Sequence, residues 1–436
     1  MEKKPITISS YPRAILHIDG DAFFTSVEQS LVPSLRGKPI VTGQERGIIA
    51  CASYEAKALG IKRGIPLFQA RQICPNLVIL PSDYEAYGLY SKRMFNIIRK
   101  YTPIVEEYSV DEAFADITGM RQVFRCSYEE IAAKIREDIH KELGLTVSAG
   151  LSLSKALAKL CSKFRKPDGF TAVQGKFIHI LLQRTPLEKV WGFGPSTVEL
   201  LTKQGLRTAY DFISLPESWA EKVLHKPGKE MWNELRGTSV WKVSEEEKTT
   251  YGSIMKSKTF TPPSTDKAFV FAKLVRNVES AFMKARRYKL RPKTIGVVLR
   301  HQDFRHDGLE AKLNRATSST LEVIPLIKEM FEQIFLQGSE YRSTLVVLAK
   351  LENDNIEQYE LFQDRLKIES LKKITSAVDA INERFGKHTV SLATSLFLTT
   401  KPRSGRDGIP SRRSSLTLRG ESTRQRLAIP RLSIKV

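Results

Sequence analysis

Apolar and polar positions along the chain alternate in blocks that predict short strands and amphipathic helices. An apolar run of strand length, residues 14–18, stops at Asp19. A continuous apolar run of this length is typical of a central strand in a covered sheet. Helical spacing of apolar residues predicts helices over 84–101 and 128–143, and another short strand is expected over 146–151. Together these elements predict an α/β unit of two layers, followed by a compact helical unit.

Two other parts of the chain show a similar pattern. Between residues 21 and 81, glycine and proline delimit a small unit, in which we expect a strand over 48–52 and a helix that begins at Tyr54. After a polar linker at 244–248, the elements follow the order βαββαβ, the split ferredoxin-like arrangement, and a helix over 366–385 comes after them. The βαββαβ elements are expected at 251–261, 267–288, 293–302, 310–316, 320–336 and 343–351.

Three acidic residues carry the candidate chemistry. Asp19 ends the first strand, and Asp111 and Glu112 are neighbours in a second acidic stretch far along the chain. Asp19 alone could equally cap the next helix. Two like charges about 4 Å apart repel by roughly 4 kcal/mol at an effective dielectric near 20, so a cluster of all three needs a cation. Hard oxygen ligands with no nearby pair of His or Cys residues favour Mg²⁺ that works on substrate phosphates. Asp111 and Glu112 can share such a site only if a turn or bulge re-aims one of them.

The charge balance and the cysteines limit the class of protein. Lys and Arg number 69 against 48 Asp and Glu in 436 residues, a formal net charge of +21. This excess predicts a polyanion partner or a membrane surface. No apolar run approaches the length of a membrane span, and the first residues lack the apolar segment of a signal peptide. The four cysteines are few and widely spaced, which suits a reducing cytoplasm and argues against structural zinc or disulfides.

Three motifs give the sequence a family resemblance. Residues 18–28 read Ile-Asp-Gly-Asp-Ala-Phe-Phe-Thr-Ser-Val-Glu, residues 53–57 read Ser-Tyr-Glu-Ala-Lys, and residues 108–113 read Tyr-Ser-Val-Asp-Glu-Ala. In this order and spacing they resemble the Y-family translesion DNA polymerases of the DinB and UmuC type, from the N-terminus to about Asp354. The resemblance implies a multidomain α+β fold shaped as a right-hand polymerase. Its expected parts are a ferredoxin-like palm (1–20 and 82–170), small fingers (21–81), a helical thumb with a helix-hairpin-helix (171–243), a linker (244–250), a βαββαβ little finger (251–353), a clamp-binding motif with a C-terminal helical segment (354–400) and a basic tail (401–436).

The resemblance also implies roles for single residues around the acidic cluster. Asp19, Asp111 and Glu112 would be catalytic and would hold two Mg²⁺ ions, with the Gly20 carbonyl on the ion that carries the nucleotide. Phe24 matches the steric gate, an aromatic face against the sugar that excludes a 2′-hydroxyl. The residues expected to contact the nucleotide are Phe23, Phe24, Tyr54, Lys57 and Lys159, and Ile48 and Ala50 would form a roof over the new base pair.

Plainer interpretations stay open for some of these residues. Phe23 and Phe24 could be core residues. Lys57 could be a solvated helix residue, and members of the DinB kind usually have Arg there, so bidentate phosphate binding is not expected. Lys155 and Lys159 stand four residues apart and share one helix face, which could simply be a basic face exposed to solvent.

Other residues are expected to bind DNA. Residues 192–194 form a Gly-Phe-Gly turn that opens a helix and resembles the helix-hairpin-helix, which grips backbone phosphates with helix N-termini. A plain turn between helices would have the same pattern. In the little finger, an exposed polar sheet face would bind phosphates with strong salt dependence and little sequence preference. The expected DNA-binding residues are Gly192, Gly194, Lys256, Lys258, Lys293, Arg300, Lys312 and Arg315.

Two features follow the last domain. Gln358, Leu361 and Phe362 fit the Gln-x-x-Leu-Phe pattern by which bacterial polymerases dock on the sliding clamp, although an amphipathic helix turn would give the same residues. The segment that continues to Val390 resembles UmuC-like C-termini. Residues 401–436 are rich in Lys, Arg and Ser, and we expect this tail to be disordered and attracted to DNA or RNA.

The resemblance therefore implies a low-fidelity, template-directed DNA polymerase that extends a primer across damaged template, in DNA repair and SOS mutagenesis, and we expect it to be cytoplasmic. Its expected partners are primer-template DNA, deoxynucleoside triphosphates and a bacterial sliding clamp, and no membrane. Three alternatives remain. One is a UmuC-like catalytic subunit that needs an accessory mutagenesis subunit, and another is a non-catalytic factor that binds DNA and the clamp. The third is a nucleotide cyclase, which shares the chemistry of the palm.

Overall fold

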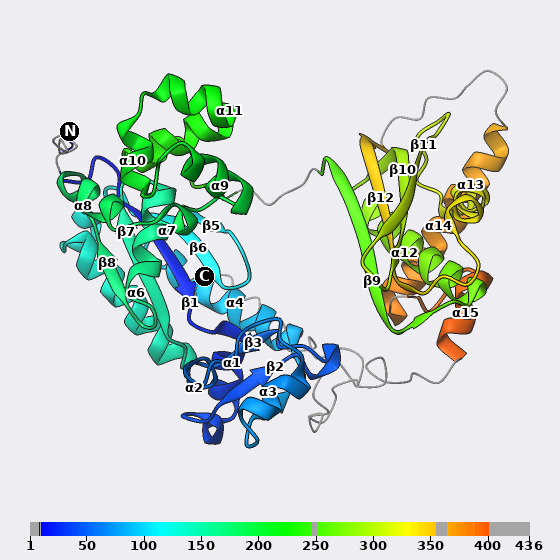
Figure 1. Ribbon diagram of the computed structural model, residues 1–436, viewed down its shortest axis with the longest axis horizontal. Coiled ribbons are helices and arrows are strands. Elements are labelled where there is room, and N and C mark those ends of the chain that lie inside the picture. Colours follow the sequence, from blue (N-terminus) through cyan, green and yellow to red (C-terminus); the bar gives the residue numbers. More distant parts are fainter. Residues whose placement is uncertain (1–7, 9, 246–250, 355–363, 387, 401–436) are drawn as a thin grey trace. The chain divides into compact units, whose positions relative to one another are not determined.

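The structure, a computed structural model, describes residues 8, 10–245, 251–354, 364–386 and 388–400 (Figure 1). These residues form two compact units, which divide between residues 246 and 247, and each unit is described by itself. Within the described ranges no helix is long and apolar enough to cross a membrane.

A five-stranded sheet forms the centre of the first unit. Its strands lie in the order β5 (Val105–Glu107), β6 (Glu112–Asp116), β1 (Ile15–Gly20), β7 (Val147–Ser152) and β8 (Phe170–Ala172). Neighbouring strands are antiparallel except β8, which runs parallel to β7. With the helices α4 (Tyr84–Arg99) and α6 (Tyr128–Leu143), the strands β7-β1-β6-β5 make the ferredoxin-like arrangement that the sequence predicted.

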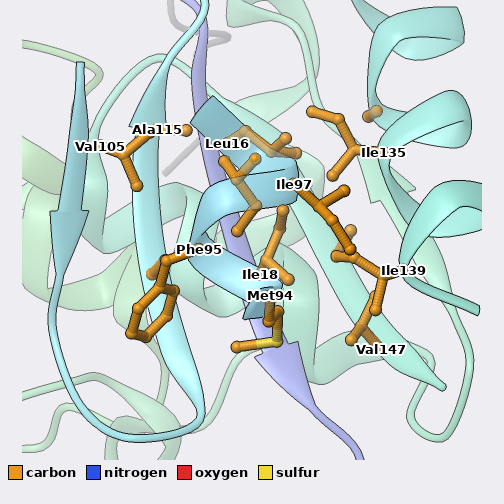
Figure 2. Close-up of a cluster of buried hydrophobic side chains, with 14 of the residues drawn as sticks. Leu16, Ile18, Met94, Phe95, Ile97, Val105, Ala115, Ile135, Ile139 and Val147 are labelled. Atoms are coloured by element: carbon orange, nitrogen blue, oxygen red, sulfur yellow. The ribbon is translucent and has the colours of Figure 1, made fainter. Parts of the chain in front are cut away.

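Both faces of this sheet are buried, and the alternation of side chains along β1 shows how. Leu16 and Ile18 join the hydrophobic cluster formed with α4 and α6 (Figure 2). Ile15 points to the opposite face, where it packs with Phe114 of β6 and Ala158 of α7 (Lys155–Phe164). The prediction of a strand in a covered sheet is confirmed. The expectation of two layers is wrong, because α7 covers the second face and adds a third layer.

Gly150 on β7 lets α7 approach the sheet closely. A Cβ atom at this position would lie 2.1 Å from the carbonyl oxygen of Ala158 and 2.2 Å from the amide nitrogen of Ser162. Both atoms belong to the backbone of α7, so neither could move aside without displacing the helix. A side chain at this position would therefore separate α7 from the sheet.

A smaller sheet follows β1 in the chain. Its strand order is β3 (Cys51–Ala52), β2 (Ile40–Thr42) and β4 (Val78–Leu80), and α1 (Phe23–Leu31), α2 (Tyr54–Ala58) and α3 (Leu67–Ile73) belong to the same region. The helix expected to begin at Tyr54 is confirmed. The strand expected over 48–52 is shorter than predicted, because Ile48 forms only an isolated bridge with Pro66. At Gly43 (φ +114°) the chain passes so close to this segment that a Cβ would lie 2.3 Å from the Ile48 carbonyl oxygen.

Short helices complete the first unit, and most of them share one hydrophobic core with α7. Glu234 is fully buried near the end of the last of these helices, where it accepts hydrogen bonds from the amides of Ala156, Val240 and Trp241 at 3.0, 2.7 and 2.9 Å. The bond from Ala156 attaches that helix to the start of α7, and the other two hold the segment that follows the helix. The helices are α5 (Met120–Phe124), α8 (Ile178–Gln183), α9 (Pro195–Lys203), α10 (Ala209–Ser214) and α11 (Glu217–Leu235).

The second unit is a four-stranded antiparallel sheet with two helices packed on one face. The strand order is β11 (His306–Lys312), β10 (Leu290–His301), β12 (Tyr341–Asn353) and β9 (Ser253–Ser264), and the helices are α12 (Lys267–Arg287) and α13 (Thr320–Ile334). The predicted order βαββαβ is confirmed. The strand expected over 310–316 begins and ends earlier, and the chain leaves the sheet after Lys312.

Two further helices, α14 (Arg365–Phe385) and α15 (Ala393–Thr400), pack against α12. Arg286 of α12 forms a bidentate ion pair with Asp379 at 2.5 and 2.8 Å. Glu279 accepts hydrogen bonds from the amide of Leu392 at 2.7 Å and the hydroxyl of Ser395 at 2.9 Å. The C-terminal segment is therefore attached to α12 at Arg286 and Glu279.

Candidate active site

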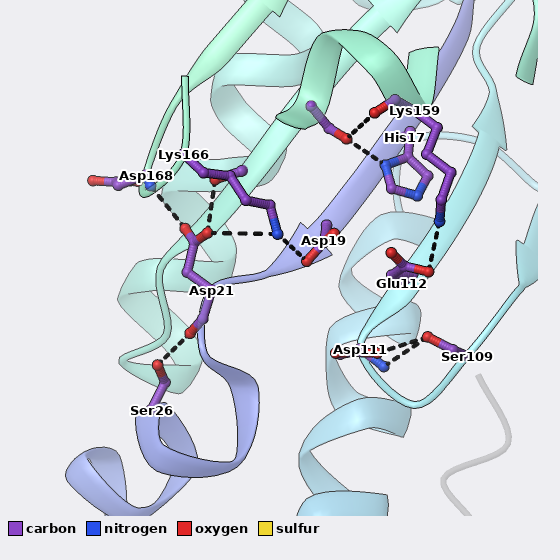
Figure 3. A network of polar contacts seen from close by, with 12 residues as sticks. His17, Asp19, Asp21, Ser26, Ser109, Asp111, Glu112, Lys159, Lys166 and Asp168 are labelled. Atoms are coloured by element: carbon purple, nitrogen blue, oxygen red, sulfur yellow. Dashed lines mark hydrogen bonds and ion pairs between the residues drawn. The ribbon is translucent and has the colours of Figure 1, made fainter. Parts of the chain in front are cut away.

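Asp19 and Glu112 face each other across neighbouring strands. They are directly paired in the antiparallel register of β1 and β6, Asp19 is 6% exposed, and Glu112 is half-buried. Asp111 lies in the bend before β6, where its carbonyl oxygen accepts a hydrogen bond from the Gly20 amide at 2.8 Å. The predicted turn next to Glu112 is therefore present. The Asp111 carboxylate accepts a hydrogen bond from the Ser109 hydroxyl at 2.6 Å and is turned toward that residue (Figure 3).

Two lysines neutralise the facing carboxylates. The Lys159 ammonium on α7 lies 2.7 Å from Glu112 Oε2, and the Lys166 ammonium, just after α7, lies 2.5 Å from Asp19 Oδ1 (Figure 3). Lys159 is 4% exposed, whereas Lys166 is partly open to solvent. Each carboxylate is thus held by one cation of the chain itself, so the burial of two adjacent acids is compensated.

Burial and these lysines separate the acidities of the pair. Burial raises the pKa of Asp19 to about 6, and the Lys166 ammonium opposes this rise without cancelling it. Burial also acts to raise the pKa of Glu112, but the hydrogen bond and charge of Lys159 outweigh it and hold that pKa below its ordinary value. A proton shared by the two carboxylates therefore resides on Asp19.

The carboxylates fit a divalent cation by their chemistry. Asp19, Asp111 and Glu112 offer hard oxygen ligands at the end of a rigid sheet, and the two that face each other already require positive charge beside them. Among the described residues, no group of three or more His, Cys, Asp or Glu is gathered closely enough to hold a metal ion. Two of the predicted ligands are therefore together, and the third is directed to Ser109.

The structure adds two residues, Asp21 and Lys166, for which no role was expected from the sequence. Asp21 is fully buried and accepts hydrogen bonds from the Ser148 hydroxyl at 2.7 Å, the Asp168 amide at 2.8 Å and the Tyr54 hydroxyl at 3.4 Å. Lys166 lies between Asp19 and Asp21, 4.0 Å from the latter. Asp21 lies within the first motif, and Lys166 lies just before the stretch Pro-Asp-Gly at 167–169.

The residues expected to bind the nucleotide are distributed around this site. Phe23 is 3% exposed and belongs to the core of the first unit. Phe24 is half-buried, and its ring stacks on Tyr87 with centroids 4.3 Å apart. Lys159 is buried on Glu112. Their contacts with a nucleotide stay predictions.

The other residues expected to contact the nucleotide lie on α2, and those expected to cover the new base pair lie just before β3 of the smaller sheet. The Lys57 ammonium lies over the ring of Tyr54 at 4.1 Å from its centroid, and Tyr54 reaches Asp21 through its hydroxyl. Ile48 is 36% exposed and Ala50 is half-buried, so both present a small apolar surface. Tyr54 therefore connects this region to the site on the five-stranded sheet.

The glycines expected to grip DNA lie where the sequence placed them. Gly194 is the residue before α9, and Gly192 has a φ of +86°, which favours glycine. Neither glycine has another residue packed against the position of a Cβ, apart from Met231 at 3.7 Å from that of Gly192. The turn is thus open at its backbone.

The predicted DNA-binding cations of the second unit divide into three groups. Arg300 and Lys312 point to the sheet face opposite the helices, because their neighbours Leu299 and Ala311 pack on the helix side. Lys256 and Lys258, by contrast, line a cavity of about 970 Å³ together with residues of α12 and α14. Arg315 is held by Glu322 in a bidentate pair, and Lys293 is half-buried. Of the three groups, only Arg300 and Lys312 lie on an exposed sheet face, where the DNA-binding residues were expected.

The expected clamp motif and the basic tail fall in parts of the chain that the structure does not describe. Gln358, Leu361 and Phe362 lie outside the described residues, as does the whole of 401–436. Both stay predictions from the sequence.

Comparisons with known proteins agree with this geometry. The model of the impB/mucB/samB family matches residues 18–163, and that of the impB/mucB/samB family C-terminal domain matches residues 252–361. A DNA polymerase IV of Desulfatibacillum aliphaticivorans is 31% identical over 397 residues, which cover 87% of this chain and 96% of the relative. A DNA polymerase IV of Listeria innocua serovar 6a is 33% identical over 317 residues, which cover 71% of this chain and 87% of the relative.

Solved structures agree on the fold. A Y-family DNA polymerase chimera superposes with a TM-score of 0.67 at 23% identity, covering 78% of this chain and 99% of that chain. An insertion ternary complex of Dbh DNA polymerase gives a TM-score of 0.50 at 24% identity over the same shares. With the facing carboxylates, the ferredoxin-like sheet and the βαββαβ unit, these matches show that the chain belongs to the impB/mucB/samB family and is a DNA-directed DNA polymerase of the DinB-type Y family.

Proposed function

We propose that this polymerase performs translesion synthesis, adding deoxynucleotides to a primer 3′ end opposite damaged template. The observation that carries the proposal is the pairing of Asp19 with Glu112 across β1 and β6, beside the bend that holds Asp111. This places three carboxylates of the chain at one end of the sheet. The proposed parts keep the boundaries expected from the sequence, with the palm at 1–20 and 82–170, the fingers at 21–81, the thumb at 171–243 and the little finger at 251–353.

Asp19, Asp111, Glu112 and the Gly20 carbonyl would hold two Mg²⁺ ions. When bound, such a pair lowers the pKa of the primer 3′-hydroxyl and stabilises the attacking and leaving oxygens of an in-line displacement. The chain prepares the site by keeping Glu112 ionised through Lys159. Asp111 would give up its hydrogen bond with Ser109 and turn toward Asp19.

Other residues would orient the nucleotide. Phe24 is fixed against Tyr87, so its ring could meet the sugar as a rigid face and exclude a 2′-hydroxyl. Tyr54 and Lys57 would contact the triphosphate, and the link from Tyr54 to Asp21 would place them relative to the acidic residues. Ile48 and Ala50 would cover the new base pair, and their small side chains would leave room for a bulky lesion.

Binding of DNA would come from backbone amides at Gly192 and Gly194 and from cations of the little finger. Because these contacts address phosphates, the affinity would depend strongly on salt and little on sequence. We also propose docking on a bacterial sliding clamp through Gln358, Leu361 and Phe362, and a role in the SOS response. A UmuC-like dependence on an accessory subunit is the second candidate, favoured by the likeness of the C-terminal segment to UmuC.

Primer extension by the purified chain tests the proposal. The chain alone, with Mg²⁺, is expected to extend a primer on intact template and past a lesion, and Glu112→Gln is expected to add nothing. Extension only after an accessory subunit is supplied would favour the UmuC-like alternative. DNA binding without extension under any of these conditions would contradict the assignment of the site.

A further inference from the structure

A polar cavity of about 970 Å³ lies between α12, α14 and the edge strand β9 of the second unit. Its volume falls within the range of roughly 300 to 1,000 Å³ that is usual for small-molecule sites, but such sites are mostly apolar. Here seven Lys or Arg side chains and three Asp or Glu side chains line the cavity, and only Met283, Tyr288 and Ala380 of the described lining residues are apolar or aromatic. A ligand of this cavity is therefore selected by its charge.

Strand alternation and one arginine explain how the cavity is formed. Lys256 and Lys258 are two residues apart on β9, so both project to the same side of the sheet, toward α12. Arg286 of α12 forms its bidentate ion pair with Asp379 of α14 and also donates to the carbonyl oxygen of Ser318, just before α13, at 2.9 Å. Arg286 thereby holds α12, α14 and the start of α13 around one space.

Three cations of the lining have no carboxylate partner among the described residues. Lys258, Arg287 and Lys289 are exposed at the opening of the cavity, and none of them forms an ion pair with another residue that the structure describes. Two of the three lining carboxylates, by contrast, are bound by arginine or lysine side chains of the cavity itself. The lining therefore carries an excess of positive charge, which attracts anions.

A buried hydroxyl at the cavity is also unpaired. Ser319 is 3% exposed and lines the cavity, and within the described part of the chain its hydroxyl has no hydrogen-bond partner. It occupies the N-cap position of α13 but makes no capping hydrogen bond. A buried hydroxyl without a partner is unfavourable, and the N-terminus of a helix attracts anions. A ligand oxygen that accepts a hydrogen bond from Ser319 would satisfy both groups.

We infer that this cavity is an anion-binding site for a ligand that carries two or more phosphate groups. Lys258, Arg287 and Lys289 bind phosphates at the opening, and the Ser319 hydroxyl donates to a phosphate oxygen that reaches inside. A single phosphate would fill only a small part of the volume, whereas several phosphates match both the volume and the separate cations. Two sources have this chemistry, the backbone of a single nucleic-acid strand and a free polyphosphate.

The site differs from the surfaces considered above. α14 begins at Arg365, beyond the residues 252–361 that the model of the C-terminal family domain matches, so one wall of the cavity lies outside that domain. Arg300 and Lys312 project from the opposite face of the sheet, and none of the described lining residues belongs to the proposed active site. The inference therefore does not depend on the proposed polymerase chemistry.

The first experiment compares two double variants of the full chain. Arg287→Gln with Lys289→Asn removes two cations of the cavity, and Asn is chosen because residue 289 has a φ of +52°, which Asn tolerates. Lys328→Gln with Lys373→Gln is the matched control, since it removes two exposed lysines of α13 and α14 that do not line the cavity. Binding of inorganic tripolyphosphate is measured by isothermal titration calorimetry, with a chelator in place of Mg²⁺.

The cavity variant is expected to bind tripolyphosphate at least about tenfold more weakly than wild type, because each lost cation removes a charge-assisted hydrogen bond. The control variant is expected to stay within about twofold of wild type, because salt screens exposed charges outside the cavity. Hydrogen exchange followed by mass spectrometry locates the anion, which is expected to protect the amides at the start of α13. Equal affinities in the two variants, or no protection at α13, would overturn the inference.

Ser319→Ala tests the buried hydroxyl separately. Because this hydroxyl has no partner in the described part of the chain, its loss is expected to leave the melting temperature unchanged or raised, while tripolyphosphate affinity falls several-fold. A lower melting temperature at an unchanged affinity would show that Ser319 caps α13 in solution, and would contradict its role in the site.

A second probe identifies the source of the phosphates. Binding of a fluorescein-labelled single-stranded oligothymidylate is measured by anisotropy for the same two double variants. If the cavity variant weakens this probe as well as tripolyphosphate, relative to the control variant, the source is a nucleic-acid strand. If it weakens only tripolyphosphate, the source is a free polyphosphate. Both results support the site, and a cavity variant that binds both probes as tightly as the control variant does refutes it.

Discussion

Asp19 on β1 and Glu112 on β6 lie directly opposite each other, and each carboxylate is bound by a lysine that approaches from the α7 side of the sheet. The two lysines differ in their surroundings. Lys159 is buried beside the rings of Tyr108 and Trp191, whereas Lys166 follows the helix and is partly exposed. Of the two ammonium groups, that of Lys166 is therefore the more open to solvent.

The first prediction concerns the proposed metal ligands. Asp111→Asn and Glu112→Gln should each abolish nucleotide addition, because one ligand charge is lost where two cations must be held beside a triphosphate. Affinity for primer-template DNA, measured by fluorescence anisotropy, should change little, since the proposed DNA contacts lie elsewhere. Extension near the wild-type rate by either variant in Mg²⁺ would disprove the ligand assignment.

The second prediction concerns the sugar. Phe24→Ala should leave deoxynucleotide addition largely intact and raise ribonucleotide incorporation, because it removes bulk and no catalytic charge. The ratio of kcat/KM for the two nucleotide types is the measurement. Because Phe24 stacks on Tyr87, a melting curve must accompany it. An unchanged ratio in a folded variant would make Phe24 a packing residue.

The third prediction is a pH dependence of stability. Burial raises the pKa of Glu234 above its ordinary value of 4.5, although hydrogen bonds from Ala156, Trp241 and Val240 oppose the rise. The folded protein then binds this proton more tightly than the unfolded chain does. The contribution of Glu234 to the free energy of unfolding is therefore largest below 4.5 and falls as pH rises through the raised pKa.

Glu234→Gln removes this ionisation while it keeps an acceptor oxygen. We expect the difference in melting temperature, wild type minus variant, to fall as pH rises above 4.5 and through the raised pKa of Glu234. Thermal unfolding followed by circular dichroism at several pH values measures it. A constant difference would mean that folding leaves the pKa of Glu234 unchanged, and a difference that increases with pH would show that Glu234 is stabilised as the anion; either result contradicts the prediction.

The fourth prediction uses the division of cations in the second unit. Arg300→Ala and Lys312→Ala, on the sheet face away from the helices, should each make the negative slope of log affinity against log salt shallower by about one. Arg315→Ala is the contrast, because Arg315 is already paired with Glu322 and should leave the slope unchanged. Anisotropy titrations between about 50 and about 200 mM salt give the slopes. The same slope change in all three variants would place DNA on both sides of the unit.

The fifth prediction tests the clamp motif. Replacing Leu361 and Phe362 together by Ala should preserve basal extension on short primer-templates and abolish stimulation by a bacterial sliding clamp on circular primed DNA. If each side chain contributes roughly 2 kcal/mol, clamp affinity should fall by about two orders of magnitude or more. Full stimulation of the double variant would leave the motif without a function, and a loss of basal activity would mean that the pair supports folding.

Periodicity predicted most of the longer elements, and the motifs identified Asp19 and Glu112, which the structure places opposite each other. The apolar run before Asp19 and the two βαβ patterns have strong local signals, so strands β1 and β9 to β12 and their helices could be predicted. The pairing of Lys159 with Glu112 could not be read from spacing, because it depends on α7 crossing the second face of the sheet. The sequence showed only a basic helix face, which is more often exposed to solvent than buried.

The little-finger cations illustrate the same limit. Alternation along a strand separates two faces, but it does not tell which face a helix will cover or what will pack at an edge. Lys258 lies on edge strand β9 and lines a cavity formed with α12 and α14, and the position of α14 depends on the ion pair between Arg286 and Asp379. Long-range contacts of this kind leave no local pattern in the sequence.

The close contact at Gly150 determines how far the backbone of α7 lies from the sheet. Because the backbone of the helix rests on a position without a side chain, the helix cannot settle deeper, and any added atom would lift it away. Lys155 and Lys159 extend from α7 to two different strands, so the position of both ammonium groups relative to the sheet depends on this one contact. A methyl group at residue 150 would therefore act at a distance, releasing Glu106 and Glu112 together although it touches neither of them.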